Sequence, residues 1–344
     1  MPATIKDIAK KVGVNPSTVS RVINGTASIS EETRQKIRDA MKELDYHPNS
    51  LARSLVNGST FTIGLVIDAG NRDAFSNAFF IRSVSAIEAV AQEKGFNLLI
   101  TSEANRENES IVKNLVLEKK LDGIILPVSA ASAELVELLV GNQFPFVFMG
   151  QPDEDIRDGH WVDTDNRQGA EDAVRYLLEA GYRKPLLLVE NQIAMYERKR
   201  IQGFRAAFRD GTPYDAMDLV LECGTDGVEI AAVLEKKLDA DHEIDSIICT
   251  NNIVAFYALQ LLKKRKIQIP DDMGILTFNN YPLAEYMEPP LTVVDVDTYR
   301  LGEEAANTLF SIIQQPNPER KEMLLPTHII KRKSTKKGEN IKIE

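Results

Sequence analysis

A group of short polar side chains lies near the amino terminus, within a stretch whose apolar residues repeat at helical spacing. The polar side chains are Ser17, Thr18, Ser20 and Arg21. Hydroxyl and guanidinium groups of this size can reach phosphates and base edges in the major groove of DNA. The alternative is a small helical bundle whose polar face has no ligand, and these residue types alone leave that alternative open.

Three predicted helices would position this polar face. Thr4 can cap the first helix and Gly13 can end it, because a left-handed residue is needed there. Asn15 and Pro16 can open the second helix as its cap and first residue, and Ser30 can open the third. The connection between the first two helices is only about four residues, so they must cross steeply, as in a helix-turn-helix.

Charge is distributed unevenly along the 344-residue chain, whose net charge is −10. Residues 1–57 contain nine Lys and Arg against six Asp and Glu, whereas the remainder contains 32 against 45. A basic head on an acidic body indicates that only the head meets a polyanion. The excess in the head is modest, so it supports DNA contact without establishing it.

Composition is that of a soluble globular protein, with 43% hydrophobic and 27% charged residues. We find no apolar run long enough to span a membrane and no signal-peptide pattern. Cys223 and Cys249 lie far apart and near no partner at metal-ligand spacing, so we interpret them as buried thiols in a reducing compartment. We therefore expect a cytoplasmic protein without membrane contact.

Catalytic motifs are missing from the sequence. Neither the glycine-rich nucleotide-binding fingerprints nor the G-x-S-x-G nucleophile elbow occurs, and the four histidines are scattered. Asp163 and Asp165 form an acidic pair at a strand end, which could hold a metal or act as an acid–base pair. The simpler interpretation is that Asp165 and Asn166 cap the following helix, and a third is that a carboxylate at a cleft mouth accepts hydrogen bonds from a polyol. We expect no enzyme activity, no cofactor and no metal site.

From residue 61 onward, apolar runs alternate with amphipathic stretches. The predicted strands are Thr62–Ile67, Asn97–Thr101, Gly123–Pro127, Phe146–Met149, Pro185–Glu190, Ser246–Cys249 and Gly274–Phe278. Examples of the predicted helices are residues 80–94, 166–181, 197–209 and 298–315. Strand–helix alternation of this kind predicts parallel sheets with right-handed crossovers, and the length favours two lobes.

The head carries several sequence blocks in a specific order. They are TIKDIA (4–9), VGV (12–14), STVSRVIN (17–24), ETR (32–34) and LDYHPN (44–49). In order and spacing these blocks resemble the head of the lactose/galactose repressor family of transcriptional regulators. The stretches FNNYPLAEY (278–286) and PPLT (289–292) are similar to the maltose-operon repressor branch of that family.

The resemblance implies roles for residues of the head. Pro16, Ser17 and Arg21 match positions at which the family reads bases. Pro16 has no N–H to donate, so it contributes shape and apolar contact only, and this departure leaves the operator sequence open. The complete set of implied DNA contacts is Thr4, Asn15, Pro16, Ser17, Thr18, Ser20, Arg21, Asn24, Ala52 and Leu55.

Residues 48–57 match the hinge of the family. Their length is marginal for an isolated helix, so we expect a helix that forms only on DNA. In the family two such helices pair in the minor groove, and Leu55 matches the leucine that wedges into the central base step, which bends DNA. The alternative is a plain linker.

For the body, the resemblance implies a two-lobed fold like that of periplasmic binding proteins. It places three crossovers between the lobes near 161–165, 290–294 and 322–327. The expected organisation is an all-α helix-turn-helix head (1–47), a hinge helix (48–57) and an α/β body with parallel sheets (58–344). The body would bind an effector and dimerise.

An effector cleft should lie beyond the carboxyl ends of the strands. Arg200, Asn251 and Asn279 match effector-contact positions, although the residue at Asn279 is commonly Asp in the family. The complete set of expected effector contacts is Phe75, Asn77, Phe79, Asp165, Arg200, Asn251 and Asn279. An aromatic ring that stacks on a sugar would come from Trp161, Tyr196 or Tyr281, for each of which core packing is the alternative.

These observations predict a repressor that binds a palindromic double-stranded operator as a homodimer and responds to a small carbohydrate. Maltose or another α-glucoside is the leading candidate effector. The alternatives are a solute-binding receptor, and a regulator that senses a sugar phosphate and binds DNA more tightly with ligand.

Overall fold

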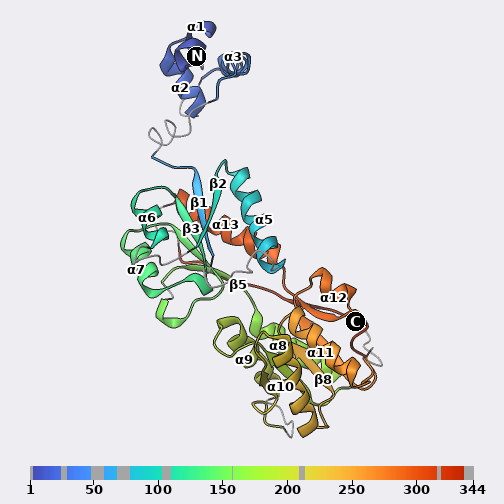
Figure 1. Cartoon of the computed structure of the whole chain (residues 1–344). Helices are drawn as coiled ribbons and strands as arrows, with labels where there is room; N and C mark the ends of the chain where they lie inside the picture. Colours follow the sequence, from blue (N-terminus) through green and yellow to red (C-terminus); the bar gives the residue numbers. More distant parts are fainter. Residues whose placement is uncertain are drawn as a thin grey trace. The chain divides into compact units, whose positions relative to one another are not determined.

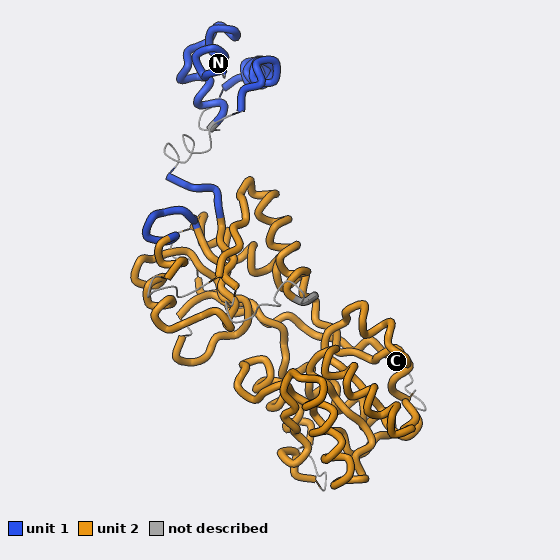
Figure 2. Tube along the Cα trace, in the orientation of Figure 1, with its two compact units in different colours: residues 1–62, 115–122 blue, residues 63–114, 123–344 orange. Residues whose placement is uncertain are grey.

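The computed structural model describes residues 3–24, 29–47, 58–67, 78–102, 110–156, 158–208, 214–315 and 319–336. The chain divides into two compact units, coloured separately in Figure 2. The first comprises residues 1–62 and 115–122, and the second comprises residues 63–114 and 123–344. The expected hinge, residues 48–57, lies outside the described residues, so its boundaries stay predictions.

The first unit contains the three predicted helices of the head. They are α1 (Ile5–Val12), α2 (Pro16–Asn24) and α3 (Glu31–Glu43). Gly13 ends α1 with a φ of 74°, in the left-handed region that glycine adopts without strain. Each helix contributes one fully buried side chain to a common core, namely Ile8, Val19 and Ile37. The head therefore has its own small hydrophobic core.

The second unit contains two six-stranded sheets, and the first of these defines the first lobe. Its strand order is β11-β5-β4-β3-β1-β2, and the pairings from β11 through β1 are parallel. The strands are β1 (Thr62–Ile67), β2 (Asn97–Ser102), β3 (Gly123–Pro127), β4 (Phe146–Met149), β5 (His160–Thr164) and β11 (Glu322–Leu325). The helices that alternate with them are α5 (Ala78–Glu93), α6 (Ile111–Leu117) and α7 (Ala133–Gly141), with short 3-10 helices at Val128–Ala130 and Glu154–Ile156. A later helix, α13 (Thr298–Gln314), packs beside α5 (Figure 1).

The second sheet defines the second lobe, with the order β12-β10-β9-β8-β6-β7. Its strands are β6 (Pro185–Val189), β7 (Val220–Glu222), β8 (Ser246–Cys249), β9 (Gly274–Phe278), β10 (Thr292–Asp295) and β12 (His328–Ile330). Its helices are α8 (Asn166–Glu179), α9 (Met195–Ala207), α10 (Gly227–Ala240), α11 (Asn252–Lys264) and α12 (Pro282–Tyr286). The edge strand β12 runs antiparallel to β10, and the other pairings are parallel.

Hydrogen bonds anchor the residues after β12 to the core of the second lobe. Ser334 is fully buried, its hydroxyl donates to the carbonyl of Ile275 at 2.6 Å, and it accepts from the amide of Thr292 at 2.7 Å. The hydroxyls of Thr335 and Tyr176 lie 2.7 Å apart, which ties the same segment to α8. These bonds satisfy buried polar groups that would otherwise weaken the core.

The chain passes between the two sheets at three places. It leaves the first sheet after β5 and enters α8 at Asn166, and it returns between β10 and α13. The third passage lies between β11 and β12, at residues 326–327. These are short single segments, so each lobe is assembled from parts of the chain that are distant in sequence.

The seven strands predicted from apolar runs are present, with bounds that differ by at most one residue. The sequence pattern did not delimit β5, β7, β10, β11 and β12. Two of these are three-residue edge strands and β11 alternates exposed and covered residues, so none is a long apolar run. Of the helices in the described ranges, none is both long and apolar enough to traverse a bilayer.

Candidate DNA-contact face and interlobe site

Local hydrogen bonds stabilise the start of α2, the helix that carries the polar face. The Asn15 carboxamide accepts from the Ser17 amide at 3.0 Å and from its hydroxyl at 2.9 Å, which caps α2 as predicted. Pro16, Ser17 and Arg21 are exposed, and Thr18 is half-buried. Ser17 and Arg21 are four residues apart, so their side chains lie on one side of the helix. This face opposes Val19, which is buried in the head.

The structure describes some of the other residues expected to contact DNA and not others. Thr4 is exposed, and its amide and hydroxyl donate to the Asp7 carboxylate at 2.9 and 2.7 Å. Ser20 is half-buried on α2. Asn24 is the last residue of α2, and Ala52 and Leu55 lie outside the described residues. Those expected contacts that the structure describes therefore lie at the start of α1 and along α2.

Arg200 is the centre of a buried polar network in the second lobe. Its Nε donates to Oδ1 of Asn166 at 3.0 Å, and its Nη1 donates to the carbonyl of Thr250 at 2.7 Å. The guanidinium carbon lies 3.9 Å from the centroid of the Phe278 ring, at cation–π distance. Arg200 thus connects α9 to the start of α8 and to the ends of β8 and β9.

Two buried carboxyl groups lie within electrostatic reach of this guanidinium. Burial raises the pKa of Glu197 to about 7, although Arg200 and Thr250 oppose the shift. Burial also raises the pKa of Asp163, at the end of β5 in the first lobe, to about 6, against the effect of two backbone amides and Arg200. The positive charge of Arg200 therefore lowers the pKa of one carboxyl group in each lobe, although the described residues show no ion pair between Arg200 and either group.

Amide and hydroxyl groups gather at the ends of β8 and β9. The side chain of Asn252 donates to the carbonyls of Phe278 and Asn279, both at 2.9 Å, and holds Asn279 at a φ of 73°. Within the described part of the chain, the buried side-chain atoms here without a hydrogen-bond partner include Oδ1 of Asn252, Oδ1 of Asn279 and the hydroxyl oxygen of Tyr281. Buried groups of this kind are costly unless water or a ligand supplies the missing partner.

Two of the expected effector contacts act as helix caps. Oδ1 of Asn251 accepts from the amides of Ile253 and Val254 at 2.9 Å, and caps α11. Oδ1 of Asp165 accepts from the amide of Gln168 at 2.9 Å and caps α8 as expected, whereas the Asn166 side chain, expected to share that role, accepts from Arg200. Among the described residues, no cluster of metal-ligating side chains occurs. The Nδ2 group of Asn251 and the Oδ2 atom of Asp165 are the side-chain groups that remain for a ligand.

The structure brings some expected residues together and leaves others apart. Arg200, Asn251 and Asn279 lie at the carboxyl ends of neighbouring strands or on the helices that follow them, as expected. Phe75 and Asn77 lie outside the described residues, and of Phe79 only its place in α5 is described.

The three stacking candidates differ in accessibility. Trp161 is buried on β5, so it packs in the first lobe. Tyr196 is 39% exposed, and its ring centroid lies 5.2 Å from the Arg200 guanidinium. Tyr281 is half-buried, and burial raises its pKa. Tyr196 and Tyr281 remain as rings that could face a sugar.

Sequence reasoning did not assign Glu197, Asn166 and Thr250 to this network. One signal could have found Glu197, because an acidic residue three positions before Arg200 shares its helix face. Asn166 and Thr250 are recognised only from the tertiary structure, since each contacts Arg200 from a distant part of the chain.

Replacing Glu197 with Gln is expected to flatten the pH dependence of stability. The pKa of Glu197 is raised from 4.5 to about 7 in the folded protein, so its contribution is fully present below the unfolded value and lost as pH rises through about 7. The wild type should lose about 1–3 kcal/mol of unfolding free energy between pH 5 and 8 that the variant retains. Urea unfolding at both pH values measures this, with the exposed Glu285→Gln as control. Equal losses in all three proteins would contradict the burial of the Glu197 carboxyl group.

Comparison with known proteins gives matches to both parts of the chain. Residues 4–49 match the family described as bacterial regulatory proteins, lacI family, and residues 174–335 match the family described as periplasmic binding protein-like domain. The transcriptional repressor PurR of Vibrio cholerae serotype O1 (strain M66-2) is 30% identical over 336 residues, 97% of this chain and 98% of that protein. The transcriptional regulator MalR of Streptococcus pneumoniae serotype 4 is 32% identical over 323 residues, 91% and 93% of the two chains.

Solved structures agree on the fold. The complex of the transcriptional regulator CelR with cellobiose has a TM-score of 0.71 and 28% identity, and covers 96% of this chain and 99% of that one. The lac repressor dimer bound to operator and the anti-inducer ONPF has a TM-score of 0.78 over 98% of this chain and 100% of that one. Its 21% identity supports the fold alone.

The head, the two-lobed body and these relatives define a helix-turn-helix transcriptional regulator with a periplasmic-binding-protein-like domain, and not an enzyme. The chain belongs to the lacI family of bacterial regulatory proteins, as the resemblance predicted.

Proposed function

We propose that this regulator represses transcription by binding a palindromic operator as a homodimer, and that a small carbohydrate between the lobes controls this binding. The observation that carries the proposal is the buried hydrogen-bond network of Arg200, together with the buried oxygen atoms of Asn279 and Tyr281 that lack a partner among the described residues. A ligand held by these groups between the lobes would favour one arrangement of the lobes. Only a ligand with different affinities for the two arrangements can act as a switch.

The chemistry of the strand ends supports a polyol ligand. Amide, carboxyl and guanidinium groups form the directional hydrogen bonds that bind vicinal hydroxyls. Asn279 and Tyr281 offer buried oxygen atoms that lack partners among the described residues, and Tyr196 offers a partly exposed ring. The relatives include a MalR and a CelR solved with cellobiose, so a glucose disaccharide is the leading class and maltose the first candidate.

Exposed apolar side chains on the second lobe support a homodimer. Val228 is 80% exposed at the start of α10, and Ile253 and Phe256 are exposed one helical turn apart on α11. A Cβ at Gly227 would lie 2.2 Å from the Tyr257 ring, so the start of α10 packs closely on α11. This places Val228 near the exposed side chains of α11. Large apolar side chains that are exposed in the single chain are typical of subunit interfaces.

A gel-shift experiment tests the proposal directly. DNA from upstream of the chain's own gene is titrated with the full chain, with and without maltose, cellobiose and sucrose. A shift on a palindromic site that one of these sugars changes supports the proposal, and mixing chains of two lengths shows whether the bound species is a dimer. If no palindromic fragment gives a specific shift, the proposed operator binding is wrong. If a shift occurs but none of the sugars changes it, the proposed control by a carbohydrate is wrong.

Leu55→Ala is expected to weaken operator binding and to reduce DNA bending. The resemblance places Leu55 as an apolar wedge between base pairs, and unstacking by such wedges is what bends DNA. Operator affinity from gel shift and bend angle from circular-permutation assays measure both effects. The matched control is Leu51→Ala, which removes the same apolar volume from the same segment. Unchanged affinity and bending in Leu55→Ala would show that residues 48–57 are a plain linker.

A further inference from the structure

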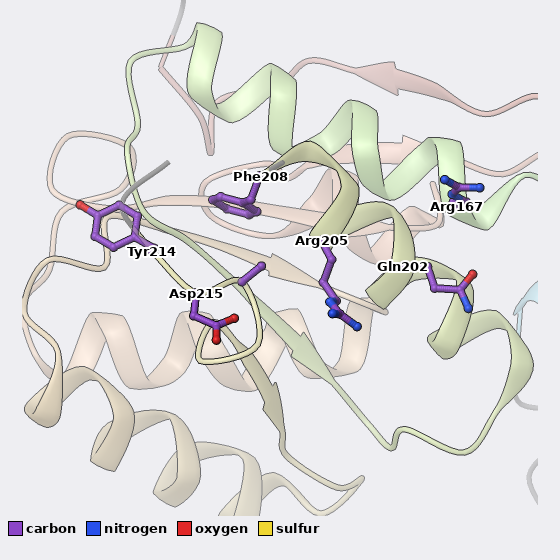
Figure 3. A pocket seen from close by; sticks show the side chains of 7 residues that line it. Arg167, Gln202, Arg205, Phe208, Tyr214 and Asp215 are labelled. Carbon is purple, nitrogen blue, oxygen red and sulfur yellow. The ribbon is translucent and has the colours of Figure 1, made fainter. Parts of the chain in front are cut away.

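A hollow of about 490 Å³ lies on the flank of the second lobe formed by α8 and α9. Figure 3 shows the side chains that line it, with Arg205 between Asp215 on one side and Gln202 and Arg167 on the other. Phe208 and Tyr214 also line the hollow, but Phe208 is buried in the core beside Phe204, and the ammonium group of Lys184 lies 4.5 Å from the centroid of the Tyr214 ring. The volume is within the range of small-molecule sites and far exceeds that of a single inorganic ion.

Close packing of two helices holds the polar side of this hollow in place. A Cβ at Gly203 would lie 1.9 Å from the carbonyl oxygen of Arg167, so α9 can approach α8 only because residue 203 is glycine. Gln202 lies next to this contact, and Arg205 lies two residues beyond it. The backbone positions of the two arginines are therefore set by rigid elements, which favours a preformed site.

Two guanidinium groups and one carboxylate are the charged groups among the described residues that line this hollow. Arg167 and Arg205 are exposed, and no ion pair of either is found in the part of the chain that the structure describes. The residues from 58 onward contain 32 basic and 45 acidic side chains, so acidic partners are abundant on this body. One lining carboxylate, Asp215, lies across from the two guanidinium groups (Figure 3). The lining is thus positive at one end and negative at the other.

This arrangement matches a ligand of mixed character. Guanidinium groups bind phosphate oxygens through paired, charge-assisted hydrogen bonds. A carboxylate accepts hydrogen bonds from hydroxyl groups. We propose that the hollow lined by Arg167, Gln202, Arg205 and Asp215 is a second effector site, which binds a small hydroxylated organic phosphate.

The proposed site is separate from the interlobe network. Asp163, Arg200, Asn251 and Asn279 do not line it, and its residues come from α8, α9 and the segment before β7. It does share α9 with Arg200, which lies two positions before Gln202 on the same helix. A ligand bound here would therefore contact the helix that carries Arg200.

Isothermal titration of the full chain with glucose 6-phosphate, glucose and inorganic phosphate tests the proposal. We expect glucose 6-phosphate to bind and glucose to bind at least tenfold more weakly at this site. Arg205→Gln and Arg167→Gln should each weaken glucose 6-phosphate binding about tenfold or more, since each removes a charge-assisted contact. The control is Arg175→Gln, which removes the same charge from an exposed position on α8 and should leave binding unchanged.

The phosphorus resonance of glucose 6-phosphate provides a second readout. It should broaden with the wild type and with Arg175→Gln, and stay narrow with the double variant Arg167→Gln/Arg205→Gln. Circular dichroism confirms that each variant is folded, which is expected because the substituted side chains are exposed.

The same measurements can overturn the proposal. If glucose 6-phosphate does not bind, or binds equally to the wild type and the double variant, the α8–α9 flank does not contain the proposed site. Equal binding of inorganic phosphate and glucose 6-phosphate would overturn the assignment to an organic ligand. These outcomes do not depend on DNA binding, so they are independent of the function proposed above.

Discussion

Gly203→Ala is expected to lower the thermal unfolding midpoint of the body by about 6–12 °C. The added Cβ would lie 1.9 Å from the carbonyl oxygen of Arg167, and a backbone atom cannot rotate away as a side chain can. Helices α8 and α9 would have to separate along their whole contact, which includes the buried Phe204. Overpacking of this kind costs about 3 kcal/mol, which corresponds to this change in midpoint for a lobe of this size.

Gly141→Ala is the matched control. Gly141 ends α7, and a Cβ there would have no atom within 4 Å. Alanine at such a helical position should leave stability unchanged or raise it by up to about 1 kcal/mol, because it restricts the unfolded chain. Scanning calorimetry compares the three proteins. If Gly203→Ala and Gly141→Ala unfold at the same temperature, α8 and α9 do not approach as closely as described.

Arg21→Ala is expected to reduce specific operator binding by about 10- to 100-fold and binding to random DNA much less. Arg21 is exposed on the same side of α2 as Ser17. A guanidinium that reads guanine contributes about 1–3 kcal/mol of discrimination, whereas a phosphate contact contributes equally on every sequence. Fluorescence anisotropy with operator and scrambled duplexes at one salt concentration separates these roles.

Lys36→Ala controls for the loss of a positive charge from the head. Lys36 lies on α3, where its ammonium group is 2.7 Å from the Glu32 carboxylate. Its removal should change specific and nonspecific binding only slightly. Parallel losses on both duplexes in Arg21→Ala would assign Arg21 to phosphate contact and leave base recognition to other residues of α2.

The head could be predicted closely from sequence because its signals are local. Gly13, Asn15 and Ser30 each act within a few residues, as a helix end or a cap, and each does so in the structure. The parallel strands could be predicted for a similar reason, since a buried strand such as β3 is a continuous apolar run. The edge strands β7 and β12 could not be predicted. They are strands because they pair with a neighbour that is distant in sequence, and their own residues give no strand pattern.

The interlobe site could be predicted in outline only. Its location followed from the strand ends, and Arg200 and Asn279 lie there as expected. The sequence could not show which atoms remain free to bind a ligand. Asn251 and Asp165 each use an oxygen to cap a helix. Arg200 donates to Asn166 and Thr250. Such partners come from segments that meet only after folding, so their choice is a tertiary property.

The interleaved path of the chain also determines when each part can fold during synthesis. The core of the head is complete once α3 has emerged from the ribosome, because Ile8, Val19 and Ile37 are all present. The first lobe must wait for α13 and β11, since Leu309 and Leu325 belong to the same core as Ile63. The second lobe must wait for Ser334 and Thr335. We therefore expect a nascent chain to carry a folded head before its body can fold, and to expose unpaired sheet edges until the last residues of each lobe are made.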